Sequence, residues 1–289
     1  MATTVSLTST SGRLVIARHT ILSLLDQREP ADRIQLNLSH EPYLYDRGVD
    51  RLPPWLREFA DEGRVDVCWT ENTGPYRKLL PALDMAGEED LVITCDDDVI
   101  YGELWLGMLL HHAERHPEAI VCGQARVPVR NVIGRLQSYV HWPRVTSDGD
   151  YPALFPIGVA GVVYKKRLLD YSFLVWPEFL RVAPRQDDLW FREASARSDT
   201  PVRVAPGVDA EIHEIRTGNT LAMTNATTRF QSTWDGSLAP FVERASYRIK
   251  AYAGLIVCEN DRVLRAVEDA SRRFDAADFG AGRLRPDDR

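Results

Sequence analysis

The sequence predicts an α/β protein with a mostly parallel sheet flanked by helices, and three observations carry this prediction. Short apolar runs alternate with helical stripes over the N-terminal third, which is the order of βαβ units. Residues 91–95 form an apolar run that suits a strand buried on both faces. Asp96, Asp97 and Asp98 directly follow that run, and ligands of open α/β sheets bind beyond the carboxyl ends of the strands.

Hydrophobic spacing gives the individual elements. Leu14, Ala17, Ile21 and Leu24 recur at helical spacing ahead of Pro30, which predicts a helix over residues 14–27. The other expected helices are residues 55–62, 103–116, 187–198, 240–256 and 261–274. The expected strands are residues 5–8, 34–38, 65–69, 91–95, 120–122, about 162–164 and 201–205. Between them, residues 124–156 lack clear periodicity, which is typical of a substrate-binding excursion.

Composition limits the partners and the compartment. The 289-residue chain has a net charge of −7, which argues against a nucleic-acid partner held by phosphate contacts. We expect no signal peptide and no membrane-spanning segment, because no window has the required apolar pattern. The four cysteines lack metal-ligand spacing and lie in or beside apolar runs, so we expect buried free thiols and a cytoplasmic location.

The acidic triplet predicts a metal site. Three adjacent carboxylates repel one another and lose hydration unless a positive charge joins them. Hard oxygen ligands favour Mg²⁺ or Mn²⁺ as that charge. A solvated acidic turn is the alternative, but the triplet follows a core strand directly, and this favours the metal.

Two glycine-containing segments are candidate ligand contacts. Residues 72–78 place a Gly-Pro turn and two cations, Arg77 and Lys78, at the start of a helical segment, an arrangement suited to an anion. A plain turn with surface cations explains the same residues equally well. Gly158 and Gly161 lack the rest of a dinucleotide fingerprint, and we expect them to let a ligand approach the backbone closely.

Further acidic and histidine residues follow. Asp187 and Asp188 begin a predicted helix, where capping explains one carboxylate better than two. His213 lies between Glu211 and Glu214, and the sequence leaves open whether it is a metal ligand or a structural residue.

The order of these motifs resembles glycosyltransferases of the GT-A fold, most closely bacterial family 2-type enzymes that build surface polysaccharides. The resemblance covers about residues 4–215. It rests on a first strand with a Thr/Ser loop, Asn-x-Gly-x-x-x-Lys, the strand-borne Asp-Asp-Asp, Gly-x-x-Gly-Val and Asp-Asp-x-Trp. The acidic pair is Asp-Asp where the inverting family often has Glu-Asp, and this leaves the identity of the base open.

The resemblance implies roles for individual residues. Asp96 and Asp98 are expected to hold a divalent cation, Mn²⁺ or Mg²⁺, with His213 as a late third ligand. Asp188 is implied to be the general base, with Asp187 beside it. The residues expected to bind the nucleotide sugar are Thr8, Ser9, Arg13, Asn72, Lys78, Asp96, Asp97 and Gly161.

These features predict a metal-dependent glycosyltransferase that moves one sugar from a nucleotide diphosphate sugar, with UDP-sugars favoured, to a hydroxyl of a glycan or a lipid-linked acceptor. Addition of single sugars is expected because the Gln-x-x-Arg-Trp signature and membrane spans of processive synthases are absent. The alternatives are a haloacid dehalogenase-type phosphatase, a GT-A-like nucleotidyltransferase and a non-catalytic carbohydrate-binding protein. The phosphatase requires its Asp-x-Asp motif on an early strand, and the nucleotidyltransferase requires an early Gly-rich phosphate loop. Neither feature is present in this sequence.

The predicted organisation is a GT-A-like catalytic domain followed by a helical extension. Residues 1–224 form the domain, with a nucleotide-sugar half of about 1–123 and an acceptor half of about 124–224. Residues 225–289 form the extension, with a loose end from 275. Its helices could pack on the domain, form a homo-oligomer with a second subunit or lie peripherally on the inner face of a membrane, and the sequence leaves these open.

Overall fold

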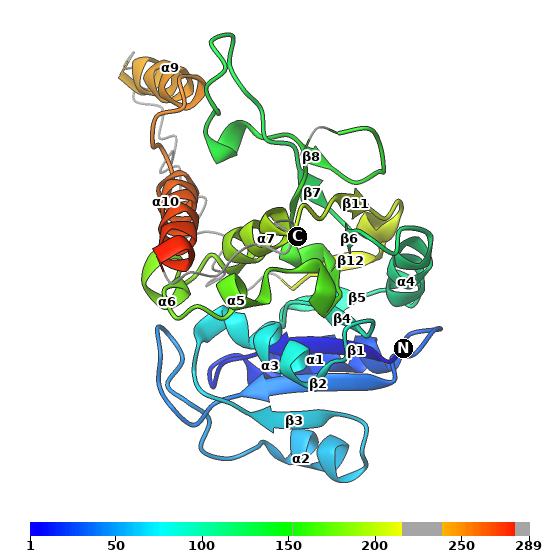
Figure 1. Ribbon diagram of the computed structural model, residues 1–289. Helices are drawn as coiled ribbons and strands as arrows, with labels where there is room; N and C mark the ends of the chain where they lie inside the picture. Colours follow the sequence, from blue (N-terminus) through cyan, green and yellow to red (C-terminus); the bar gives the residue numbers. More distant parts are fainter. Residues whose placement is uncertain (152, 216–238, 281–289) are drawn as a thin grey trace.

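A seven-stranded sheet forms the centre of the computed structural model, which describes residues 1–151, 153–215 and 239–280 (Figure 1). Its strands are β1 (Thr3–Thr8), β2 (Arg33–Leu38), β3 (Asp66–Trp69), β4 (Leu91–Thr94), β6 (Ile120–Cys122), β10 (Val162–Tyr164) and β11 (Val202–Val204). Their order is β11-β6-β10-β4-β1-β2-β3, and every neighbouring pair is parallel except the two pairs that include β10. The predicted α/β class with a mostly parallel sheet is confirmed.

Helices cover both faces of this sheet. The α-helices up to residue 197 are α1 (Leu14–Leu25), α2 (Pro54–Asp61), α3 (Leu80–Met85), α4 (Trp105–Arg115), α5 (Tyr171–Leu174), α6 (Phe179–Val182) and α7 (Asp187–Arg197). The 3-10 helices are η1 (Gly74–Lys78), η2 (Tyr139–His141), η3 (Gly158–Ala160), η4 (Lys166–Leu168) and η5 (Val208–Glu211). Ile93 packs in one core with α1, α2 and α4, and its neighbour Val92 packs in the other with α3 and α7.

Strand register brings three chain segments to one edge of the sheet. Ser6 of β1 and Val162 of β10 both pair with Thr94, the last residue of β4. Because β10 runs antiparallel to β4, the segment that enters β10 lies at the same edge as the segments that leave β1 and β4. The loop after β1, the acidic triplet and the glycine segment 158–161 therefore lie together at this edge.

Two small sheets extend the structure in ways that the sequence did not indicate. The residues after the acidic triplet form β5 (Val99–Tyr101), which pairs antiparallel with β12 (Ile212–Glu214). The stretch expected to be irregular contains a three-stranded antiparallel sheet of β7 (Ala125–Arg126), β8 (Arg144–Val145) and β9 (Phe155–Pro156). Strands this short carry little periodicity, which is why the stretch read as irregular.

Two C-terminal helices follow, α9 (Ala239–Tyr252) and α10 (Glu259–Gly280). In Figure 1, α10 lies beside α6 and α7, and its Val263 and Val267 are buried in the core that α7 shares. The expected loose end at 275 is wrong as far as Gly280, because α10 continues to that residue. The predicted boundary at 224/225 lies outside the described residues, as do residues 281–289.

Two expectations about the chain's environment can be compared with the structure. The free thiols of Cys95 and Cys122 are buried, as predicted, whereas those of Cys68 and Cys258 are only half-buried. Within the ranges described above, no helix has the length and apolar character needed to cross a bilayer.

Candidate functional site

The acidic triplet lies directly against the loop that follows β1. The buried carboxylate of Asp97 accepts a hydrogen bond from Ser9 Oγ at 2.5 Å, and Arg13 Nη2 lies 2.6 Å from its other oxygen. The same guanidinium nitrogen lies 2.8 Å from Asp98 Oδ2. Burial raises the pKa of Asp97 to about 6, although Arg13 and the Ser9 hydroxyl oppose that shift. The predicted grouping of Ser9 and Arg13 with the triplet is therefore present in the structure.

Asp96 faces a different cation and is fixed through its backbone. Its carboxylate lies 3.2 Å from Lys78 Nζ, and its N–H donates to the Tyr101 hydroxyl at 3.0 Å. That hydroxyl in turn donates to the carbonyl of Val159 at 3.0 Å. Tyr101 thus ties the triplet to the glycine segment, a role that the sequence did not indicate because no motif included Tyr101.

Lys78 is the cation shared by the acidic triplet and the acidic pair. Besides Asp96, its Nζ lies 2.9 Å from Asp187 Oδ2 and 3.7 Å from Asp188 Oδ1, and its side chain is 8% exposed. Burial would lower the pKa of Lys78, but the charges of Asp187, Asp96 and Asp188 raise it well above its ordinary value. Lys78 is therefore a fixed positive charge.

A buried ion pair holds the turn that presents Lys78. Arg77 Nη2 lies 2.9 Å from Asp46 Oδ2, with both side chains at most 3% exposed, and it also donates to the carbonyl of Ser9 at 3.3 Å. Asn72 accepts from the Gly74 N–H at 3.2 Å and shapes the same turn. Neither alternative for this segment describes Arg77, because the residue is buried and Asp46 takes its charge. Asp46 lies in an irregular stretch where no sequence pattern marked it.

Asp188 is the more accessible member of the acidic pair. Its Oδ2 accepts a hydrogen bond from the Gly158 N–H at 3.0 Å, and its side chain is 31% exposed against 9% for Asp187. Burial of the carboxyl group, assisted by the charge of Asp187, raises the pKa of Asp188 to about 7 despite the opposing attraction of Lys78. The hydrogen bond of Asp188 therefore goes to the backbone of Gly158, outside α7. In the described structure, the side chain of Gln186, the N-cap residue of α7, makes no cap hydrogen bond.

Gly158 in η3 and Gly161 directly after it are each needed as glycine for a different structural reason. A Cβ on Gly158 would lie 2.8 Å from Asp188 Oδ1 and 2.9 Å from Lys78 Nζ, so this glycine lets the acidic pair approach the backbone. Gly161 has φ +87°, and a Cβ there would lie 2.5 Å from the Trp105 ring. Packing against Trp105 thus accounts for Gly161. Its predicted contact with a nucleotide sugar has no counterpart among these contacts.

The remaining predicted residues lie further from the carboxylates. Thr8 Oγ1 donates to the carbonyl of Asn37 on the neighbouring strand at 2.9 Å. His213 lies on β12 opposite Ile100, and its side chain is exposed. Within the described ranges, His213 does not form a group of three potential metal ligands with Asp96 and Asp98. The role of His213 as a third metal ligand stays a prediction.

The acidic cluster, as we name this arrangement, suits a hard divalent cation. It consists of Asp96, Asp97, Asp98, Asp187 and Asp188 with the cations Lys78 and Arg13. When all are ionised, five carboxylates face two cations and three negative charges remain in excess. Asp96 and Asp98 are 33% and 19% exposed, so their oxygens are accessible, and carboxylate oxygens are the ligands that Mg²⁺ and Mn²⁺ prefer.

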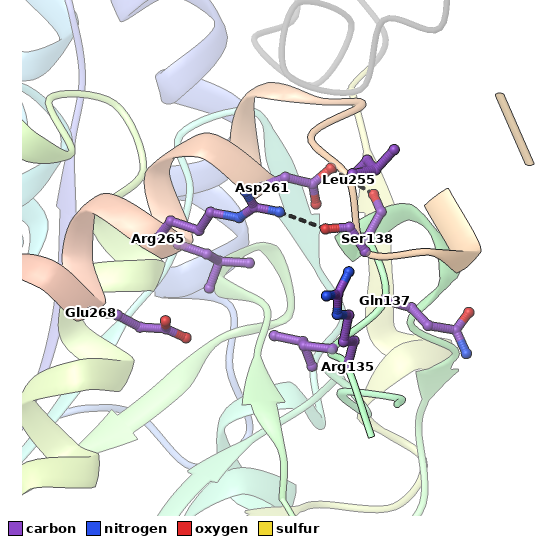
Figure 2. Close-up of a pocket in the computed structure, with 10 residues that line it drawn as sticks. Arg135, Gln137, Ser138, Leu255, Asp261, Arg265 and Glu268 are labelled. Atoms are coloured by element: carbon purple, nitrogen blue, oxygen red, sulfur yellow. Dashed lines mark hydrogen bonds between the residues drawn. The ribbon is translucent and has the colours of Figure 1, made fainter. Parts of the chain in front are cut away.

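A hollow of about 390 Å³ lies elsewhere, between residues 135–138 and α10 (Figure 2). Figure 2 shows Arg135, Arg265 and Glu268 around it, and Ser138 Oγ donates to Asp261 Oδ2 at 2.7 Å. No residue of the acidic cluster lines this hollow. It belongs to the junction between the C-terminal helices and the residues that precede η2.

Comparison with solved structures found similarities at low identity. S. aureus TarS matches with 17% identity and a TM-score of 0.46 over 72% of this chain and 35% of that one. S. aureus TarS 1-349 in complex with UDP-GlcNAc matches with 16% identity and a TM-score of 0.49 over 76% and 60%. A 4-diphosphocytidyl-2C-methyl-D-erythritol synthase matches with 12% identity and a TM-score of 0.46 over 75% and 94%. The chain thus spans about a third of the whole TarS chain that it resembles.

Comparison at the level of sequence gives a family. No match to a curated protein was found. Residues 15–158 match the model of glycosyl transferase family 2, a segment that begins in α1, contains the acidic triplet and ends at Gly158. Residues 15–158 therefore form a glycosyl transferase family 2 domain.

Proposed function

We propose that the chain moves a single sugar from a nucleoside diphosphate sugar to a hydroxyl of a glycan or a lipid-linked acceptor, and that the reaction requires a divalent cation. One observation carries this proposal. The ammonium group of Lys78 lies within 3.2 Å of Asp96 in the acidic triplet and within 2.9 Å of Asp187 in the acidic pair. The groups suited to a leaving diphosphate and those suited to an acceptor hydroxyl therefore share one site.

On the donor side, the departing nucleoside diphosphate carries negative charge that must be neutralised. Asp96 and Asp98 would hold Mn²⁺ or Mg²⁺, which supplies Lewis-acid stabilisation of that charge when bound. Lys78 and Arg13 are the cations already fixed at this position and would bind diphosphate oxygens through charge-assisted hydrogen bonds.

On the acceptor side, Asp188 would remove the proton of the attacking hydroxyl. Its Oδ2 is engaged by the Gly158 N–H, its Oδ1 lies 3.7 Å from Lys78, and its side chain is more exposed than that of Asp187. A carboxylate with a raised pKa is a stronger proton acceptor than an ordinary one. Asp187, at 2.9 Å from the lysine, would mainly position Lys78.

The test is a screen of nucleoside diphosphate sugars for stabilisation of the protein against heat, with and without Mn²⁺. A ligand that binds only the native state raises the apparent stability. UDP-sugars are the first donors to try, beginning with UDP-GlcNAc. We expect the melting temperature to rise when donor and Mn²⁺ are present together. We expect UDP to be released when an acceptor is added.

Three other outcomes would each contradict the proposal. Release of inorganic phosphate from sugar phosphates would identify a phosphatase. Formation of a nucleotide sugar from a nucleoside triphosphate with release of pyrophosphate would identify a nucleotidyltransferase. Stabilisation by free sugars alone, indifferent to nucleotide and metal and without turnover, would identify a carbohydrate-binding protein.

A further inference from the structure

A second group of potential metal ligands lies on α4, outside the acidic cluster. His112 and His116 are four residues apart on this helix, so their side chains share one face. Asp148, from the loop between β8 and β9, reaches the same place. Its Oδ2 lies 3.4 Å from His112 Nε2 and 3.6 Å from His116 Nε2. One atom from each of the three side chains lies within 4.8 Å of the others.

His112 is buried without a hydrogen-bond partner for its Nε2. The residue is 5% exposed, and this nitrogen makes no hydrogen bond within the described part of the chain. Burial, together with the proximity of His116, lowers the pKa of His112, although the charge of Asp148 opposes that shift. A buried polar atom without a partner is uncommon in native proteins and calls for an occupant.

The spacing of Asp148 from the two histidines fits a tetrahedral metal ion. Zinc binds histidine nitrogen and carboxylate oxygen at about 2.0–2.2 Å, so two ligands of one tetrahedron lie about 3.3–3.5 Å apart. The two distances from Asp148 to the histidines are close to this value. We propose that His112, His116 and Asp148 bind a divalent transition metal of the zinc class, with an open position left for water.

The surroundings of Asp148 support a ligand role. Arg203 Nη1 lies 3.6 Å from Asp148 Oδ1, and the Gly149 N–H donates to the same oxygen at 3.1 Å. These contacts hold the carboxylate by one oxygen and leave Oδ2 directed at the histidines. In metal sites, residues that hydrogen-bond to a metal-binding side chain orient that side chain toward the metal.

Bound metal would join two separate parts of the fold, and the ion pair of Asp148 with Arg203 would connect them to a third. His112 and His116 lie on α4, Asp148 on the loop after β8, and Arg203 on β11. The site differs in chemistry from the acidic triplet, because two imidazoles favour zinc where carboxylates alone favour Mg²⁺ or Mn²⁺. We therefore assign it a bracing role, independent of the proposed sugar transfer.

The experiment measures zinc binding by the full chain, prepared without a polyhistidine tag and stripped of metal. We expect one zinc ion per chain from titration calorimetry in the presence of excess Mg²⁺, which occupies the carboxylate site. Cobalt substitution should give the intense visible absorption of a tetrahedral ion. His116→Ala and Asp148→Asn, both at partly exposed positions, should each weaken zinc binding about a hundredfold or more.

Matched variants distinguish this site from other zinc-binding groups. His111→Ala removes an exposed histidine from the same helix and should leave the affinity unchanged. Asp98→Ala should also leave it unchanged, because that residue belongs to the acidic cluster. Zinc binding that survives both His116→Ala and Asp148→Asn, or that is lost in Asp98→Ala, would overturn the assignment. Absence of zinc binding by the unmodified chain would do the same.

Discussion

Gly158 and Asp188 are joined by a single hydrogen bond, in which the Gly158 N–H donates to Asp188 Oδ2 across 3.0 Å. The bond links the segment that enters β10 to the start of α7, thirty residues later in the chain. It fixes the orientation of the carboxylate and leaves Oδ1 facing Lys78. The position of the proposed base therefore depends on a backbone group rather than on another side chain.

Gly158→Ala is expected to reduce sugar transfer by about a hundredfold, because an added Cβ would displace both Asp188 and Lys78, and a misplacement of about 1 Å can cost that much in rate. Steady-state rates and donor affinity would measure the effect. Gly12→Ala is the control, since a Cβ there meets nothing within 4 Å. Equal rates for Gly158→Ala and the unmodified chain would contradict the assigned geometry.

Asp188→Asn is expected to lower the transfer rate by about a hundred- to ten-thousand-fold, because the amide keeps the size of the side chain but accepts no proton. Donor affinity should stay close to normal, since the donor's charge is handled by Asp96 and Asp98. Asp187→Asn should have the smaller effect on rate. The assignment of the base is wrong if Asp187→Asn is the variant that loses transfer while Asp188→Asn keeps it.

The pH dependence of the transfer rate follows from the raised pKa of Asp188, about 7 in the folded protein against an ordinary 3.8. A base must be ionised, so the rate should rise with pH through about 7 and then level off. Between pH 4 and 7 the folded state holds the proton that the unfolded state releases. The contribution of this group to the free energy of unfolding therefore falls as pH rises through that window.

Rate profiles and urea unfolding, each measured from pH 5 to 9, test both statements. Asp188→Asn should lose the rising limb in the rate and flatten the matching slope in stability. A rate that is constant across this range in the unmodified enzyme would exclude Asp188 as the titrating base.

Asp98→Ala is expected to abolish transfer and the metal-dependent part of donor binding, while the fold survives. Asp98 is partly exposed and pairs with Arg13 rather than with the core, so its loss should not unfold the domain. Calorimetric titration of the donor with and without Mn²⁺ would measure the metal-dependent part. Undiminished turnover of the unmodified chain after chelation of all divalent metal would end the metal hypothesis.

Vesicle flotation with anionic lipid at low salt distinguishes between two uses of the apolar residues at and after the end of α9, which are contact with a membrane and packing on the domain or on a second subunit. Ile249, Tyr252, Leu255 and Ile256 at the end of α9 are 42–68% exposed, and the neighbouring Lys250 is exposed as well. Apolar side chains beside cations are typical of surfaces that lie on a membrane. Vesicle flotation measures the association, and Ile249→Asp should weaken it. If the unmodified protein stays unbound and forms dimers in sedimentation, a second copy covers these residues instead.

The sequence predicted the parts of the site that local patterns report. The apolar run before Asp96 identified a buried strand, and the carboxyl ends of such strands carry ligand sites. Arg13 and Ser9 were placed near the triplet by motif order, and the structure brings both against Asp97. These residues directly follow the ends of β1 and β4, and the register of the two paired strands decides which of the side chains that follow them lie together.

The sequence could not predict contacts that join distant irregular segments. Asp46 pairs with Arg77 across thirty-one residues, and no pattern marks Asp46 as the partner of that cation. β5 is only three residues long and pairs with β12 more than a hundred residues later, so its strand character depends on that partner. Such long-range pairings follow from the assembled fold and leave no mark on nearby residues.

The antiparallel strand β10 has a consequence for any attempt to divide this enzyme. It lies between β4 and β6, so β6 pairs with β10 and β11, and within the described residues no strand that precedes β6 in the chain is its neighbour. A fragment that ends at residue 123 would therefore carry β6 as an unpaired segment with exposed apolar side chains. Two fragments divided at that point should assemble when produced together, whereas the N-terminal one alone should aggregate.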